Sequence, residues 1–151
     1  TRLQEIERSF TLDGRITPRF IWFEINSSQC NERCVHCYVE NAQSGLPFAD
    51  SFPKLSASDW KRVIAESADL GFVRAQFIGG EPFMWQGEQG EDVLDLAEWA
   101  ISKKFKFIEI FTNGTLLTKK NVKRIAELKI RVAVSLYSID PWTHDNCSLT
   151  I

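Results

Sequence analysis

The sequence has no long apolar run and no excess charge of one sign. No segment approaches the roughly 18 apolar residues of a membrane helix, and the polar start TRLQEIERSF lacks the apolar region of a signal peptide. We therefore expect a cytoplasmic protein without a membrane partner. The chain of 151 residues has 18 Lys and Arg against 20 Asp and Glu and shows no basic stripe, which disfavours a nucleic-acid partner. Its composition, 44% hydrophobic and 25% charged, is that of one globular domain.

Cysteine is scarce, with 4 in the chain, but three of them lie within the short stretch C30-N-E-R-C-V-H-C37. In a reducing compartment, clustered cysteines more often hold metal or do redox chemistry than form disulfides. A structural zinc ion takes four protein ligands, whereas three thiolates suit a metal centre with one open coordination position. Zinc would need either His36, which is awkwardly placed between two cysteines, or the distant Cys147.

Short aromatic and β-branched runs alternate with helical patterns along the chain. The expected strands are 20–25, 72–78, 105–111 and 130–136. The expected helices begin at a Ser56 cap, near 91–104, and around Thr118. This order predicts an α/β fold with a parallel sheet and right-handed crossovers. In addition, Asp13-Gly14 predicts a small N-terminal hairpin.

Polar or cysteine-rich motifs lie at the carboxyl end of each predicted strand. Three follow a strand directly: Cys30 to Cys37, Gly79-Gly80-Glu81-Pro82 and Thr112-Asn113-Gly114; the fourth, Ser135, lies at the end of the last strand. Parallel strands open on one face, so we expect these residues to converge. Two glycines let the backbone approach a ligand closely, and Glu81 offers a carboxylate to a cationic group such as an α-ammonium. Taken singly, the Gly-Gly-Glu-Pro and Thr-Asn-Gly stretches are also ordinary turn sequences.

Together, C30-x3-C34-x2-C37, G79-G-E-P82, T112-N-G114 and V134-S-L136 resemble the radical S-adenosylmethionine (SAM) enzymes in order and spacing, over about residues 20–146. The resemblance implies that Cys30, Cys34 and Cys37 ligate a [4Fe–4S] cluster and that SAM chelates the remaining iron. It also implies reductive cleavage of SAM to a 5′-deoxyadenosyl radical, which abstracts hydrogen from the substrate.

The same resemblance implies roles for further residues. Gly79, Gly80 and Glu81 would bind the methionyl ammonium of SAM. Thr112, Asn113 and Ser135 would lie near its ribose or carboxylate, and Tyr38, like His36, resembles residues that pack against the cluster or cofactor. An electron donor such as flavodoxin or ferredoxin would be required.

The stretches C-V-H-C-Y-V, T-N-G-T-L-L and S-L-Y-S-I-D-P-W-T-H-D look most like the SPASM-type maturases that modify ribosomally made peptides or proteins. A radical SAM enzyme of cofactor or small-molecule biosynthesis is the alternative within the family. From another class, a non-catalytic iron–sulfur or zinc-binding module stays open.

The family core is a partial (β/α) barrel, of which this sequence would supply about four parallel strands and three helices, the C-terminal half missing. We expect an N-terminal extension at 1–19 and an incomplete radical SAM core domain at 20–151. The closing residues, 144–151, resemble the beginning of the family's next loop. The chain would then be an N-terminal piece of a longer enzyme, or a second chain would complete the barrel.

Overall fold

The structure, a computed structural model, describes residues 11–12, 15–16, 19–26, 29–37 and 54–149. The strands are β1 (Thr11–Leu12), β2 (Arg15–Ile16), β3 (Phe20–Asn26), β4 (Arg74–Gly79), β5 (Phe107–Thr112) and β6 (Arg131–Val134). The helices are α2 (Ala57–Asp69), α3 (Val93–Ser102), α4 (Lys119–Leu128), α5 (Pro141–Ser148) and the short 3₁₀ helix η2 (Pro82–Met84).

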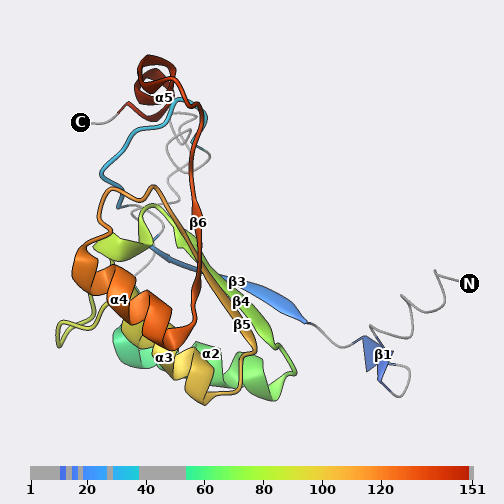
Figure 1. The fold of residues 1–151 in the computed structure, drawn as a ribbon. Helices are drawn as coiled ribbons and strands as arrows, with labels where there is room; N and C mark the ends of the chain where they lie inside the picture. Colours follow the sequence, from blue (N-terminus) through green and yellow to red (C-terminus); the bar gives the residue numbers. More distant parts are fainter. Residues whose placement is uncertain (1–10, 13–14, 17–18, 27–28, 38–53, 150–151) are drawn as a thin grey trace, which may run out of the picture.

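The main sheet is parallel throughout, with its four strands in the order β3-β4-β5-β6. Figure 1 shows α2, α3 and α4 covering one face of this sheet. The predicted α/β fold of a partial barrel is thus confirmed. The antiparallel pairing of the expected N-terminal hairpin is also confirmed, since β1 pairs with β2 in a separate sheet, whereas the Asp13-Gly14 turn lies outside the described residues.

Helix starts follow local capping. Ser56 and Asp59 form a capping box, in which Asp59 N donates to Ser56 Oγ at 3.0 Å and Ser56 N to Asp59 Oδ2 at 3.2 Å. Asp92 and Asp95 do the same for α3, which explains why that helix begins at Val93. The Thr118 side chain caps α4, which begins next to Thr118, where the sequence predicted the helix start.

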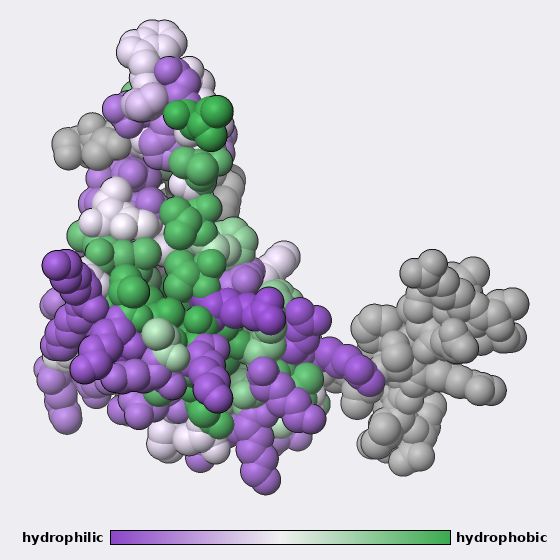
Figure 2. Space-filling model, viewed as in Figure 1, coloured by the Kyte–Doolittle hydropathy of each residue, from purple (hydrophilic) through white to green (hydrophobic). Residues whose placement is uncertain are grey.

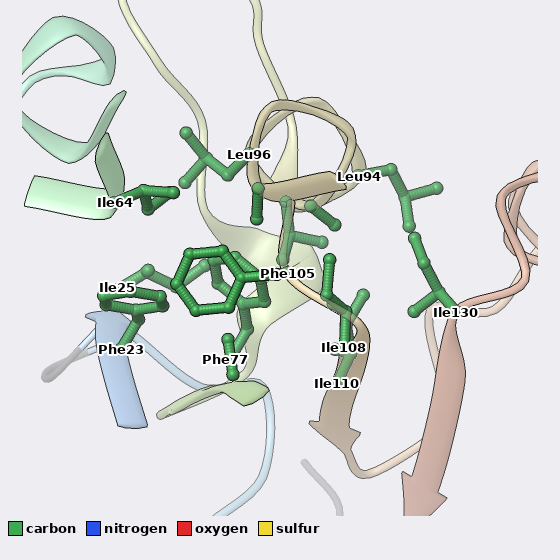
Figure 3. Close-up of a cluster of buried hydrophobic side chains, with 14 of the residues drawn as sticks. Phe23, Ile25, Ile64, Phe77, Leu94, Leu96, Phe105, Ile108, Ile110 and Ile130 are labelled. Atoms are coloured by element: carbon green, nitrogen blue, oxygen red, sulfur yellow. The ribbon is translucent and has the colours of Figure 1, made fainter. Parts of the chain in front are cut away.

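The core lies between the sheet and the three covering helices. Figure 3 shows its side chains from β3, β4 and β5 meeting those of α2 and α3. Fully buried members include Ile64, Phe77, Leu96 and Ile110, each 0% exposed. Alternation along the strands sends Phe77 and Ile110 to the helix face and their neighbours in sequence to the other face.

The opposite face and one edge of the sheet are open in the described part of the chain. Trp22 on β3 is 65% exposed and Phe111 on β5 is 43% exposed. No described strand pairs with the outer edge of β6. Figure 2 shows apolar side chains gathered along β6 and the segment that follows it, where Val134, Leu136 and Ile139 are exposed.

The expectation of a loop was wrong for residues 144–148, because Pro141–Ser148 form a further helix, α5; residues 150–151 lie outside the described residues. The cause is local: the Asp140 carboxylate accepts from Thr143 N at 2.8 Å, and Pro141 stands in the first turn, where its missing N–H costs nothing. Figure 1 places α5 beyond the end of β6. None of the helices among the described residues is long and apolar enough to cross a membrane.

Candidate functional site

A cavity of about 560 Å³ opens at the carboxyl ends of the four parallel strands. Its wall includes most of the residues predicted from the sequence: Cys30, Cys34, Cys37, Gly79, Gly80, Thr112, Asn113 and Ser135. Two of the predicted cofactor residues are not in this set. Glu81 does not line the cavity, and Tyr38 lies outside the described residues. The volume is typical of a site for a small molecule. The parallel sheet therefore does bring the strand-end motifs together.

The cysteine loop is held by backbone hydrogen bonds. Cys37 N donates to Cys34 O at 2.9 Å, which closes a turn, and Glu32 N donates to Cys30 Sγ at 3.4 Å. All four cysteines are free and partly exposed. Burial raises the pKa of the Cys30 and Cys34 thiols, with nearby carboxylates acting in the same direction. A bound metal reverses this effect, because a coordinating thiol loses its proton.

The donor set fits an iron–sulfur cluster, because Cys30, Cys34 and Cys37 line one cavity. In the part of the chain that the structure describes, which includes every cysteine, no three His, Cys, Asp or Glu side chains are arranged to hold one metal ion. A cubane cluster binds each thiolate through a different iron atom, so its ligands need not meet at one point. Three thiolates beside a cavity also leave one iron open to a small ligand.

Close backbone approach explains the two glycines after β4. Gly79 has φ +136°, and a Cβ there would lie 2.6 Å from Asn26 O. Gly80 N donates to Asn26 O, and a Cβ at Gly80 would overlap the Gln29 carbonyl. Glu81 N donates to Gln29 O at 2.8 Å. The neighbour that requires glycine is therefore the backbone that leads into the cysteine loop.

The Glu81 carboxylate is 0% exposed and is satisfied by the protein. Its Oε1 accepts from Phe83 N at 3.0 Å and from Thr112 Oγ1 at 2.8 Å, and its Oε2 accepts from Asn113 N at 2.8 Å. Among the described residues, the cavity wall contains Gly79 and Gly80 but not Glu81. This carboxylate joins the turn after β4 to the turn after β5.

The Thr-Asn-Gly turn after β5 also reaches the cysteine loop. Asn113 Nδ2 donates to Asn31 Oδ1 at 2.9 Å and contacts Cys30 Sγ at 3.9 Å. Thr112 Oγ1 accepts from Gly114 N at 3.0 Å while it donates to Glu81. This turn therefore ends a strand and also contacts the cysteine loop.

Sequence reasoning missed Glu32 and Tyr137 as parts of this cavity wall. Burial raises the pKa of the Glu32 carboxyl, and this residue is only 5% exposed. Burial also raises the pKa of the Tyr137 phenol, so its hydroxyl is a hydrogen-bond donor at neutral pH. A signal for Tyr137 was present, because it stands two residues after Ser135, the spacing that returns to the same side of an extended chain.

Comparison with known proteins supports the family that the cysteine motif and the parallel sheet indicated. Residues 27–148 match the model of the Radical SAM superfamily, and the chain belongs to this superfamily of enzymes, which use a [4Fe–4S] cluster and SAM. It is 30% identical over 131 residues to the antilisterial bacteriocin subtilosin biosynthesis protein AlbA of Bacillus subtilis, covering 85% of this chain and 26% of AlbA. It is 34% identical over 112 residues to Fe-coproporphyrin III synthase of Methanosarcina barkeri, covering 74% of this chain and 25% of that protein.

Solved structures show the same fold. SuiB of Streptococcus suis bound to S-adenosylmethionine has a TM-score of 0.69 at 19% identity, covering 98% of this chain and 31% of SuiB. The complex of SuiB with its precursor peptide SuiA gives a TM-score of 0.68 at 20% identity, covering 98% of this chain and 30% of SuiB. The chain thus spans about a quarter to a third of the length of these relatives.

Proposed function

We propose that this chain provides the cluster-binding and SAM-binding part of a radical SAM enzyme that modifies a ribosomally made peptide or a protein. The observation that carries the proposal is the shared cavity: the three clustered cysteines and the ends of the other three strands line one space of about 560 Å³. Residues 20–151 form the core in this proposal, and residues 1–19 are an extension.

Cys30, Cys34 and Cys37 would hold the [4Fe–4S] cluster, which supplies the electron for reductive cleavage of SAM to a 5′-deoxyadenosyl radical. That electron would come from a donor of the flavodoxin or ferredoxin class. The turn of Gly79, Gly80 and Glu81 would face the methionyl ammonium of SAM.

Within that turn, the Glu81 carboxylate acts as a positioning group, because its hydrogen bonds go to the protein. Thr112, Asn113 and Ser135 would flank the ribose or carboxylate of SAM. Tyr38 would pack against the cluster or the cofactor. The apolar side chains of Trp22 and Phe111 would exclude water from the reacting groups, since both line the cavity.

The peptide substrate is supported by the likeness to AlbA, a bacteriocin biosynthesis protein, and to SuiB, which was solved with a precursor peptide. Cofactor biosynthesis is the second candidate, and the likeness to Fe-coproporphyrin III synthase favours it. SAM cleavage by the loaded protein should be measured with pooled short peptides and, separately, with an iron tetrapyrrole that precedes iron coproporphyrin III in its synthesis, because a synthase releases that compound as its product. Stimulation by peptides alone supports the first function, whereas stimulation by the tetrapyrrole alone supports the second.

Anaerobic reconstitution with iron and sulfide tests the site itself. The loaded chain should hold about four irons, and addition of dithionite and SAM should yield 5′-deoxyadenosine. Cys34→Ala should lose both properties. Cys147→Ala is the matched control, because the contact of Cys147 with the cysteine loop is made by its backbone carbonyl, which alanine retains. One zinc per chain would refute the cluster, and iron binding without SAM cleavage would refute catalysis by this chain.

A further inference from the structure

Tyr137 lies just beyond β6 and lines the cavity beside the cysteine loop. Its hydroxyl donates a hydrogen bond to Cys34 Sγ at 3.8 Å. The side chain is 39% exposed, so its ring is partly covered by neighbours. The contact joins a residue after the fourth strand of the main sheet to a cysteine that follows the first.

Two imidazole rings fix the orientation of the Tyr137 ring. His36, from the cysteine loop, meets it edge to face with ring centroids 4.4 Å apart at 76°. His144, from α5, stacks on it with centroids 5.7 Å apart at 24°. The Tyr137 backbone N also donates to His144 Nδ1 at 3.3 Å. Held in this way, the hydroxyl is directed at Cys34 before any ligand binds.

The last turn of α5 fixes the loop on which Cys34 lies. Arg33 N donates to Ser148 O at 3.1 Å, and Val35 N donates to Cys147 O at 3.0 Å. These two bonds flank Cys34 on both sides in the sequence. The helix that carries His144 thus also sets the position of the acceptor sulfur.

We propose that the Tyr137 hydroxyl raises the reduction potential of the cluster held by the three cysteines, an inference that rests on the cluster site of the proposed function. A hydrogen bond to a ligand sulfur withdraws electron density from the thiolate and stabilises the additional negative charge of the reduced state. One electron passes from a low-potential donor of the flavodoxin or ferredoxin class to the bound cluster, and no bond of the protein is made or broken. Without the hydroxyl, the same reduction requires a stronger donor.

Tyr137→Phe tests the role, because it removes the hydroxyl and keeps the ring between the two imidazoles. The reconstituted chain should be titrated with a redox mediator series while the paramagnetic reduced cluster is followed by electron paramagnetic resonance. From the usual net strength of one hydrogen bond, the equilibrium constant for reduction should fall about threefold to tenfold. That change is a shift of about 28 to 59 mV to more negative potential for one electron. Trp142→Phe, on α5 but 75% exposed, is the control that should leave the potential unchanged.

The outcomes separate the two claims. If the wild-type chain takes up no cluster, the proposed function and the role of Tyr137 both fail. If Tyr137→Phe holds the wild-type amount of iron at the wild-type potential, the role of Tyr137 fails and the cluster site stands. A negative shift in Tyr137→Phe with none in Trp142→Phe supports the proposal. An equal shift in both variants would assign the effect to the general packing of α5 and would overturn it.

Discussion

Replacing Glu81 by glutamine should destabilise the protein, although the two side chains have nearly the same shape. The carboxylate is fully buried and accepts three hydrogen bonds, two at Oε1 and one at Oε2. Glutamine has one acceptor oxygen and one NH₂ donor group. In the less costly orientation, the amide oxygen keeps the bonds from Phe83 and Thr112. The NH₂ group then faces the N–H of Asn113, which leaves a buried donor without an acceptor.

An unsatisfied buried donor costs about 1–3 kcal/mol in the free energy of unfolding. For a chain of this size, this corresponds to a fall in Tm of roughly 2–12 °C. Urea denaturation followed by far-UV circular dichroism should show a lower midpoint at an unchanged slope. Glu127→Gln, on the exposed face of α4, is the matched control and should change the unfolding free energy by less than about 0.5 kcal/mol. If Glu81→Gln unfolded at the wild-type midpoint, Glu81 would not be the hydrogen-bonded link between the two strand-end turns.

Three further changes probe other parts of the fold. Gly80→Ala should lower the free energy of unfolding in urea by about 2 kcal/mol or more, because its Cβ would overlap backbone atoms. Gly90→Ala, where φ is +85° and the surrounding space is open, should lower it by only about 1–2 kcal/mol. Equal losses in the two variants would contradict the close approach at Gly80. Phe77→Ala in the core should lose about 3–5 kcal/mol in the same melts, and a loss below 1 kcal/mol would show that the site is not packed as described. Burial opposes ionisation of Asp95, but hydrogen bonds from Asp92 N and Arg124 hold its pKa below its ordinary value. The contribution of Asp95 to stability is therefore present above about pH 4 and is lost as the pH falls further. Asp95→Asn should flatten the decline of the urea midpoint between pH 5 and pH 3. An unchanged decline in this variant would contradict the contribution of Asp95.

Much of the architecture was predictable because its causes are local. Strand runs and helix caps act within a few residues, and Ser56 and Thr118 marked two helix starts correctly. The helix α5 was missed although Asp140-Pro141 is also a local start signal. The family likeness had indicated a loop in this region.

The candidate site was likewise predictable from the sequence only in part. Sequence spacing alone pointed to three thiolates on one loop and to motifs at the ends of four strands, because a parallel sheet opens all its strand ends on one face. Sequence could not show which partner each side chain takes there. For Glu81, the structure adds that the carboxylate accepts hydrogen bonds from Phe83, Thr112 and Asn113.

By itself, the sequence determined the cysteine spacing, the strands and most of the helices, since these depend on neighbours along the chain. Only the tertiary structure decided that Asn113 reaches Cys30 and that Tyr137 reaches Cys34. Those pairs are separated by 83 and 103 positions in the chain. Their contact depends on strand register and on how α5 docks against the cysteine loop, and no local preference encodes either of these.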